Sequence, residues 1–253
     1  MTEGRTTLIT GAGKRVGRIV ALGLADDGYD VVVHYHSSSD DAEEVAAEIR
    51  AKGRRAWTAQ ADLSDPSNAQ SLVETAVAQG GPISLLVNTA SLFKDDSLAT
   101  MSLETWDPLI IINLTSPVFL MKAFASQNEI PAGASVVNFL DQQIATPNPE
   151  FFSYFVAKIG LEGATRLAAF ELAPKIRVNA VAPGLTLPSW GQDQQTFEAR
   201  QNLTPLKAGL GPEDLLDAVR YLAHAERVTG HIIFVDSGQR LMGLGNTELA
   251  PND

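Results

Sequence analysis

Short apolar runs alternate with amphipathic stretches along almost the whole chain. The apolar runs are brief and rich in valine, isoleucine and leucine, which predicts buried strands. The stretches between them repeat apolar residues three or four positions apart, which predicts helices that pack by one face. The predicted strands are Thr6–Thr10, Asp30–His36, Arg55–Ala61, Ile83–Asn88, Ser135–Asp141, Ile176–Ala182 and His231–Asp236. The predicted helices are Lys14–Asp26, Asp40–Ala51, Pro66–Gln79, Leu103–Ala125, Phe151–Ala173 and Glu213–His224.

Strands that alternate with helices indicate an α/β protein with a parallel sheet covered on both faces. We therefore predict a single-domain Rossmann fold over residues 1–253, with a doubly wound sheet of about seven strands. No internal repeat, low-complexity segment or linker divides the chain. Residues 185–211 lack a clear pattern apart from a short helix at Gln194–Asn202, and long loops of this kind commonly bind substrate.

The helices at Leu103–Ala125 and Phe151–Ala173 are apolar on nearly every side. A helix of this kind is buried on more than one side. One side of each would pack on the sheet. We expect much of the other side to pack on a partner subunit.

The composition narrows the function. The chain has 253 residues, a hydrophobic content of 45%, a formal net charge of −11 and no cysteine. The acidity argues against nucleic-acid or anionic-membrane partners. Without cysteine, disulfides, thiolate nucleophiles and cysteine–zinc sites are excluded, and no metal site is predicted. We expect no apolar run of the roughly 20 residues that a membrane helix needs. The short polar N-terminus does not resemble a signal peptide, so a cytoplasmic enzyme is expected.

A glycine-rich turn joins the first predicted strand to the first helix. Gly11, Gly13 and Gly17 let the chain turn tightly, and Arg15 and Val16 lie between them. Backbone N–H groups at such a helix N-terminus bind phosphate. This context predicts that these five residues bind the pyrophosphate of a dinucleotide, rather than forming an ordinary turn.

The end of the second strand suggests which dinucleotide. His34 and His36 lie there, followed by Ser37 and Ser38, with no acidic residue at the tip. An acidic residue would bind a ribose 2′-hydroxyl, whereas histidine and serine donors suit a 2′-phosphate. NADPH is therefore favoured. The alternative is that the histidines are polar residues at an exposed strand end.

Asp62 and Leu63 follow the third strand. Their main chain and the carboxylate are placed to hydrogen-bond an adenine. An equally good interpretation is a helix cap before Pro66.

Tyr154 and Lys158 lie four residues apart in a predicted helix, and Asp141 precedes the tyrosine by thirteen residues. The four-residue spacing puts Tyr154 and Lys158 on one helix face. A nearby ammonium favours the phenolate, so we expect Lys158 to lower the pKa of Tyr154 and make it a proton carrier in hydride transfer. The pair alone is a weak motif, and the cofactor loop gives it weight.

In this order the motifs resemble those of the short-chain dehydrogenase/reductase family over nearly the whole chain. The matching segments are the glycine loop, Asn88-Thr89-Ala90, Asn113, Tyr154 with Lys158, Pro183-Gly184 and Asp236-Ser237-Gly238. The resemblance implies that Asn88, Ala90, Ser91, Pro183 and Gly184 line the cofactor, together with Tyr154 and Lys158. It also implies that Asn113 holds a water near the lysine.

Three departures from the family pattern stand out. Arg15 occupies a position that is usually glycine, and Thr89 replaces a second asparagine. Asp141 occupies the position of the catalytic serine. A serine hydroxyl can donate a hydrogen bond to a substrate carbonyl, and an ionised aspartate cannot. This weakens the prediction of a simple ketone reductase.

Within the family, the pteridine and dihydromonapterin reductases are the most similar in pattern. The similarity rests on Arg15, Ser91, Phe93, Asp141 and His34-Tyr35-His36. Ser37 departs from it, because an arginine is frequent there beside the 2′-phosphate. The resemblance implies NADPH, a homotetramer, and a pterin or dihydrofolate-type substrate.

The resemblance also assigns roles. Tyr154 delivers a proton to a ring nitrogen, Lys158 positions the nicotinamide ribose, and Asp141 orients Tyr154 or a water and stabilises positive charge. Phe93 would stack on the pterin. Arg15 and Ser91 would reach cofactor and substrate, and Trp190 is a candidate contact from the substrate loop.

Each of these residues has a structural alternative. Phe93 and Trp190 could pack on the core, Asp141 could cap a turn, and Asn113 could satisfy a backbone group. Two alternative functions stay open as well: a generic carbonyl reductase of the same family that tolerates Asp141, and a non-catalytic dinucleotide-binding sensor.

Overall fold

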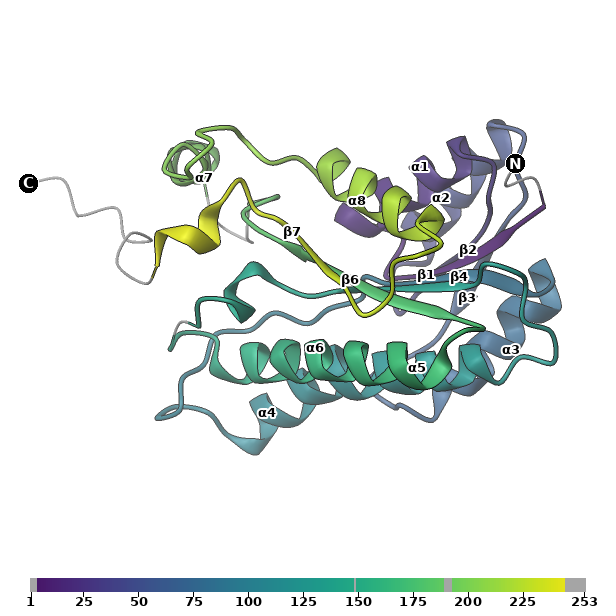
Figure 1. The fold of residues 1–253 in the computed structure, drawn as a ribbon, viewed down its shortest axis with the longest axis horizontal. Coiled ribbons are helices and arrows are strands. Elements are labelled where there is room, and N and C mark those ends of the chain that lie inside the picture. The colour runs from purple at the N-terminus through teal and green to yellow at the C-terminus, as the bar shows by residue number, and fades with distance from the viewer. Residues whose placement is uncertain (1–3, 148, 189–192, 244–253) are drawn as a thin grey trace, which may run out of the picture.

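Seven parallel strands form one sheet in the computed structural model of the chain, which describes residues 4–147, 149–188 and 193–243. The strands run in the order β3-β2-β1-β4-β5-β6-β7 (Figure 1). Their bounds are β1 Thr6–Thr10, β2 Asp30–Tyr35, β3 Ala56–Gln60, β4 Ile83–Asn88, β5 Ser135–Phe139, β6 Arg177–Pro183 and β7 Ile232–Val235. The order reverses direction between β1 and β4, and such a switch point opens a crevice at the carboxyl ends of the strands.

Helices cover both faces of this sheet (Figure 1). One layer holds α1, α2 and α8, and the other holds α3, α5 and α6. The helix bounds are α1 Arg15–Asp26, α2 Ser39–Ala51, α3 Asn68–Gly80, α4 Leu103–Ile110, α5 Ser116–Ala125, α6 Phe152–Leu172, α7 Gln194–Gln201 and α8 Pro212–His224. Short helical segments are η1 Ile111–Thr115, η2 Gln142–Ile144 and η3 Gln239–Met242. The predicted Rossmann fold is therefore confirmed.

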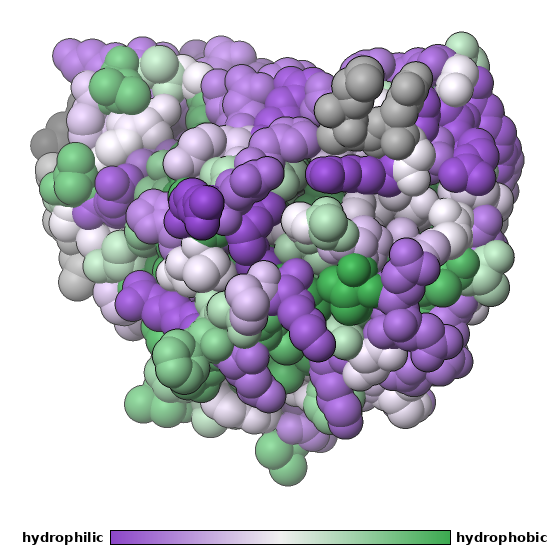
Figure 2. Space-filling view, turned by 45° about the vertical axis from the view of Figure 1, so that its right-hand side comes forward, coloured by the Kyte–Doolittle hydropathy of each residue, from purple (hydrophilic) through white to green (hydrophobic). Residues whose placement is uncertain are grey.

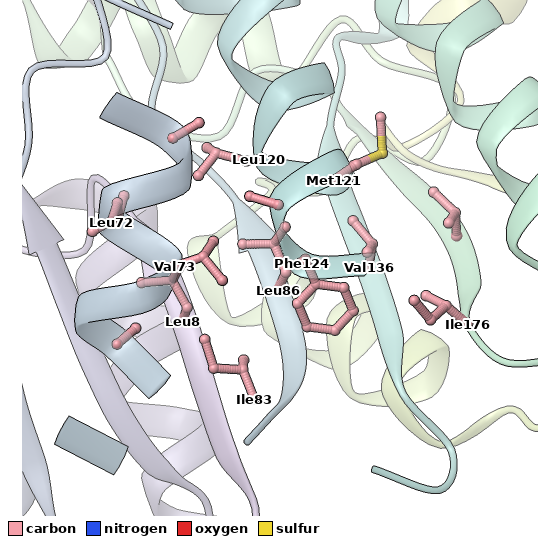
Figure 3. Packing of buried hydrophobic residues seen from close by; sticks show 14 of the residues in the cluster. Leu8, Leu72, Val73, Ile83, Leu86, Leu120, Met121, Phe124, Val136 and Ile176 are labelled. Atoms are coloured by element: carbon pink, nitrogen blue, oxygen red, sulfur yellow. The ribbon is translucent and has the colours of Figure 1, made fainter. Parts of the chain in front are cut away.

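Successive side chains along each strand point to opposite faces of the sheet, so there is a hydrophobic core on each face. Leu8, Leu86 and Val136 point to the layer of α3, α5 and α6, where they meet Phe124 (Figure 3). Their strand neighbours point to the layer of α1, α2 and α8, as Ile9 does. Because the sheet is buried on both faces, its strands read as continuous apolar runs rather than as alternating ones.

The predicted helix Leu103–Ala125 is interrupted by a π-helical segment, η1, which contains Asn113. By length and composition this helix is apolar enough to cross a membrane, with a mean hydropathy of 1.6 over its most apolar part. From the sequence we expect no apolar run long enough for a membrane helix, so this helix differs from that expectation. The packing accounts for the composition, because Leu109, Leu120 and Phe124 are fully buried against other parts of the chain.

Strand β5 ends at Phe139, two residues before the predicted end at Asp141. The Leu140 backbone still donates to Val181, but the chain then turns and Asp141 caps η2 by accepting a hydrogen bond from the Gln143 N–H at 2.9 Å. Asp141 therefore lies just beyond the carboxyl end of β5.

Several apolar side chains of α5 and α6 are uncovered. Leu167 is 74% exposed and Phe170 is 90% exposed, and Phe119 and Ile159 are also exposed. Figure 2 shows hydrophobic residues gathered mainly in the lower half of the view, where the layer of α3, α5 and α6 lies. Large apolar residues grouped on one face are typical of an interaction surface.

Candidate active site

Tyr154, the predicted proton carrier, lies in the first turn of α6. Its hydroxyl donates to the Asp141 carboxylate at 3.4 Å. One helical turn later, the Lys158 ammonium donates to the Phe139 carbonyl at 2.8 Å and lies 5.5 Å from the Tyr154 ring centre. The structure thus brings the three residues together at the end of β5. Asp141 caps a turn, as one alternative proposed, and also contacts the tyrosine.

Burial controls the charges in this group. Desolvation raises the pKa of Asp141 to about 6, although the Gln143 N–H and Lys158 partly oppose it. Desolvation also lowers the pKa of Lys158 to about 8. The pKa of Tyr154 is raised well above its usual value by desolvation and by the negative charge of Asp141. The expected lowering of the tyrosine pKa by Lys158 is therefore wrong for this arrangement. Tyr154 stays protonated, which suits a proton donor.

An aromatic group lines the opening beside Tyr154. Phe93 is 49% exposed and meets the Tyr154 ring edge-to-face at 4.8 Å between ring centres. Its ring also stacks on Phe151 at 4.3 Å. Phe93 is therefore not a core residue, and a flat aromatic ligand could contact it. Phe151 was predicted only as a helix residue, because nothing in the local sequence shows that its ring faces a loop almost sixty positions away.

Asn113 clamps the segment after β4. Its side-chain N–H groups donate to the Leu92 and Leu109 carbonyls, and its oxygen accepts from Ser91 Oγ at 2.6 Å and from the Leu92 N–H at 3.2 Å. Asn113 is fully buried. These bonds match the alternative in which it satisfies backbone groups, and they position Ser91 beside the site.

Asp96 is a site residue that the sequence did not predict. Its carboxylate accepts hydrogen bonds from the Ser153 N–H and hydroxyl, and its carbonyl accepts from the Phe152 N–H. It therefore caps the N-terminus of the helix that carries Tyr154. No sequence pattern pointed to it, because this cap lies 57 positions before the helix that it serves.

The backbone of the glycine-rich turn is closely packed, as expected for a turn that binds a dinucleotide phosphate. A side chain at Gly17 would come within 2.3 Å of the Gly11 carbonyl oxygen, and one at Gly11 would reach Ala90 at 3.0 Å. Gly13 packs closely on the start of α2, where a side chain would approach the Ala42 backbone to 3.3 Å. Only glycine leaves the backbone N–H groups at the N-terminus of α1 open to a phosphate.

Arg15 replaces glycine at a left-handed position, with φ of 50°. Its guanidinium donates to the Pro188 carbonyl at 3.0 Å, so it spans from the glycine turn to the substrate loop. Val16 follows it and packs partly into the core of the α1 layer. The placement of Arg15 between the two segments is compatible with contact to both cofactor and substrate.

Thr89, which replaces the second asparagine of the family motif, is hydrogen-bonded to the end of β1. Its hydroxyl donates to the Thr10 carbonyl, and the Ala90 N–H donates to Thr10 Oγ1 at 3.1 Å. Asn88 donates to Asn138 at 2.8 Å within the sheet. These bonds join the ends of β1, β4 and β5 beneath the crevice.

His34 has a different role from the predicted contact with the cofactor. Its Nδ1 accepts the Gly11 N–H at 3.0 Å, and its Nε2 lies 3.1 Å from the Ala61 carbonyl. The side chain is 2% exposed. Both ring nitrogens are thus used within the protein, so His34 supports the glycine turn instead of donating to a 2′-phosphate.

Of the other predicted cofactor residues at this end, His36, Ser37 and Asp62 are exposed, and Leu63 is buried. His36 lies 3.6 Å from the Asp62 carboxylate, Ser37 is exposed, and Ser38 is the cap residue of α2. Asp62 also accepts the Ser64 N–H at 2.9 Å, within the loop after β3. The helix cap that was the alternative for Asp62 is instead at Ser67, because α3 begins at Asn68. Leu63 is buried and its carbonyl accepts from Ser116.

Pro183 and Gly184 lie at the end of β6, where the Gly184 N–H donates to the Val235 carbonyl at 2.8 Å. A side chain at Gly184 would come within 2.8 Å of the Asp236 backbone, so this turn is also sterically closed. Trp190 lies outside the described residues. Within those residues, no group of acidic and histidine side chains is arranged to hold a metal ion.

Comparisons with known proteins place this fold and site in a family. Residues 11–240 match the family described as enoyl-(acyl carrier protein) reductase. The chain is 34% identical to 3-oxoacyl-[acyl-carrier-protein] reductase FabG of Staphylococcus epidermidis over 92% of this chain and 98% of that protein. It belongs to the short-chain dehydrogenase/reductase family and is an oxidoreductase of that family.

Two solved structures are similar over nearly their whole length. The FolM alternative dihydrofolate reductase 1 from Brucella suis, in complex with NADP, has a TM-score of 0.91 and 37% identity, covering 95% of this chain and 97% of that one. The corresponding protein from Brucella canis, complexed with NADP, has a TM-score of 0.89 and 36% identity over 98% of each chain.

The burial of His34 predicts an acid-dependent loss of stability. Its pKa is lowered from 6.5 to about 4, because desolvation disfavours the charged ring. The unfolded chain then binds more protons than the folded one between these pH values, so stability is lost as pH falls through this window. We expect this difference in proton binding to lower the free energy of unfolding by about 3 kcal/mol between pH 7 and pH 4. Urea unfolding between pH 7 and pH 4 measures it.

The matched variants are His34→Gln, which cannot titrate but can both accept and donate, and His36→Gln at an exposed position. His34→Gln should flatten the pH dependence, and His36→Gln should leave it unchanged. An equal slope in the native protein and in His34→Gln would contradict this assignment.

Proposed function

We propose that the protein is an NADPH-dependent reductase of a pterin or dihydrofolate-type substrate. The observation that carries the proposal is the Asp141 carboxylate beside the Tyr154 hydroxyl, where a ketone reductase of the family would have a serine. A carboxylate accepts hydrogen bonds and stabilises positive charge, so it suits a ring that gains a proton on nitrogen.

The residues divide the chemistry between them. Bound NADPH supplies the hydride to a ring carbon. Tyr154, which stays protonated, delivers the proton to the neighbouring nitrogen. Asp141 holds the tyrosine hydroxyl in place and offsets developing positive charge. Lys158, fixed on the Phe139 carbonyl, is placed to orient the nicotinamide ribose. Phe93 offers an exposed ring for a flat substrate, with Ser91 and Arg15 at the edge.

Several features support NADPH as the cofactor. The tip of β2 carries His36, Ser37 and Ser38 without an acidic residue of its own. The two similar FolM structures contain NADP. His36 Nε2 lies 3.6 Å from the Asp62 carboxylate, which holds the imidazole at the tip of β2, where a 2′-phosphate would lie. The proposal includes a cytoplasmic location, where NADPH is a diffusible reductant.

A carbonyl reductase is the second candidate, because the chain aligns with FabG over 98% of that protein. The presence of Asp141 is the argument against it. A 3-oxoacyl substrate therefore belongs in any activity screen.

We also propose that the enzyme is a homotetramer. The exposed apolar residues of α5 and α6, with Phe170 at 90% and Leu167 at 74% exposure, support a partner on this face. The sequence-based expectation of a subunit contact concerned the same two helices.

The proposed function predicts which substrates the enzyme reduces. Purified protein should oxidise NADPH with dihydropterins or dihydrofolate and should not turn over simple ketones or 3-oxoacyl thioesters. The measurement is NADPH absorbance across such a panel. Faster turnover of the ketones would reject the proposal.

Replacing the carboxylate tests its role directly. Asp141→Ser should lower kcat/KM for the pterin by about a hundredfold, because a charge-stabilising group contributes a few kcal/mol to the transition state. Asp217→Ser on α8, far from the crevice, is the control and should keep native activity. If Asp141→Ser turns over the pterin at the native rate, the assigned role is wrong.

The shifted pKa values predict a bell-shaped pH profile of kcat/KM. Asp141 acts ionised, so activity should fall as pH drops below about 6. Lys158 acts as a cation, so activity should fall again above about 8. Rates from pH 5 to 9 at constant ionic strength measure both limbs. The acidic limb should be absent in Asp141→Asn, and its persistence there would assign it to another group.

The oligomer prediction is tested by light scattering. The native protein should have the mass of four chains of 27.0 kDa. Phe170→Glu puts a charge on the apolar face and should yield a smaller species, whereas Leu98→Glu, on an exposed loop, should not. A native monomer would remove the support that the apolar helices give to a tetramer.

A further inference from the structure

Two glutamine side chains meet at the backbone of Leu185. The amide nitrogen of Gln201 donates to the Leu185 carbonyl at 2.7 Å, and the amide oxygen of Gln239 accepts the Leu185 N–H at 3.3 Å. Both glutamines are buried, each with 8% exposure. Leu185 directly follows the Pro183-Gly184 turn at the end of β6. The two side chains thus satisfy both backbone groups of one residue beside the crevice.

Gln201 also reaches the other end of the substrate loop. Its amide nitrogen donates to the Leu210 carbonyl at 2.9 Å. Leu185 and Leu210 lie near the two ends of residues 185–211, and the backbone carbonyls of both accept hydrogen bonds from the Gln201 carboxamide. The amide oxygen of Gln201 lies close to Gly209, because a Cβ atom added at Gly209 would be 3.1 Å from it. One side chain at the end of α7 closes the base of the loop.

Gln239 belongs to a second set of contacts on the same loop. It follows Ser237 and Gly238, and the Ser237 carbonyl accepts the Leu206 N–H at 3.2 Å. Ser237 Oγ donates to the Ala208 carbonyl at 3.3 Å. The segment after β7 is therefore bound to the outer part of the loop, while Gln239 holds its inner part.

The chemistry requires an amide at position 201. Two carbonyl oxygens need N–H donors, and a glutamine amide has two. A carboxylate of the same shape has only acceptors, and an aliphatic side chain would leave both carbonyls unpaired. Unpaired buried carbonyls are costly, so the loop would open to hydrate them.

We propose that Gln201 and Gln239 are positioning residues that hold the substrate loop against the turn after β6. Substrate affinity then depends on the hydrogen bonds that both side chains make to the Leu185 backbone. The choice of substrate rests on the proposed function. Neither glutamine touches the reacting atoms, so their effect should fall on KM more than on kcat.

Steady-state kinetics test the proposal with a matched control on the same helix. Gln201→Leu and Gln201→Glu should each raise the KM of the dihydropterin roughly tenfold, the scale of one buried hydrogen bond, and change kcat less than about twofold. Gln194→Leu is the control, because Gln194 is exposed and, among the residues that the structure describes, its amide donates to Glu198 on the same helix. A fall in kcat at unchanged KM would indicate a merely structural role and overturn the proposal.

A double-mutant cycle tests whether the two contacts with Leu185 are coupled. Gln201→Leu and Gln239→Leu each release one side of Leu185, so the double variant should raise KM clearly less than the product of the two single effects. Independent, multiplicative effects would show that the two glutamines act separately, and would overturn the coupling.

Hydrogen exchange gives a readout that needs no turnover. In the presence of NADPH, amides in 183–188 and 201–210 should exchange faster in Gln201→Leu than in the native protein and in Gln194→Leu. Unchanged exchange would overturn the proposal even if the substrate assignment holds. If no pterin is turned over, the proposed function fails and the exchange result still decides the role of Gln201. Should Gln201→Leu not fold, Gln201→Asn, which keeps the donors but is shorter, takes its place.

Discussion

The burial of the Asp141 carboxylate beside Tyr154 and Lys158 is the constraint on which the functional interpretation depends. Three ionisable groups lie close together at the end of β5, and the charge of Asp141 raises the pKa of both Tyr154 and Lys158. Desolvation raises the pKa of Asp141 to about 6 and lowers that of Lys158 to about 8, so both remain charged near neutral pH. The opposite charges of Asp141 and Lys158 offset part of the cost of desolvating them, and Tyr154 beside them stays protonated and neutral.

Buried polar side chains connect this group to segments that are distant in sequence. Asn113 holds the segment with Ser91, and Asp96 caps the helix that carries Tyr154. His34 supports the glycine turn, and Gln201 closes the substrate loop. Each satisfies backbone groups that no helix or strand can pair, which is the usual reason for burying a polar side chain. These side-chain hydrogen bonds hold together the loops at the carboxyl ends of the strands.

The similarity to FabG and to the FolM structures covers the same residues, so overall likeness does not distinguish their chemistry. One fold supports many reactions, and the distinction lies in the site. We propose that Asp141 is the residue that distinguishes the two, because an ionised carboxylate cannot donate a hydrogen bond to a ketone oxygen. The exposed Phe93 ring beside Tyr154 adds a surface suited to a flat substrate.

The order of strands and helices, the glycine turn and the Tyr154–Lys158 pair could all be predicted from the chain, because each depends on local periodicity or short spacing. The resemblance to the family also placed Asp141 near the tyrosine. The role of His34, the contact of Phe151 with Phe93, and the caps and clamps made by Asp96 and Gln201 emerged only in the folded molecule. These depend on which distant backbone groups a fold leaves unpaired. The direction of the Tyr154 pKa shift was likewise misjudged from spacing, because burial and the charge of Asp141 both raise this pKa and both depend on the tertiary structure.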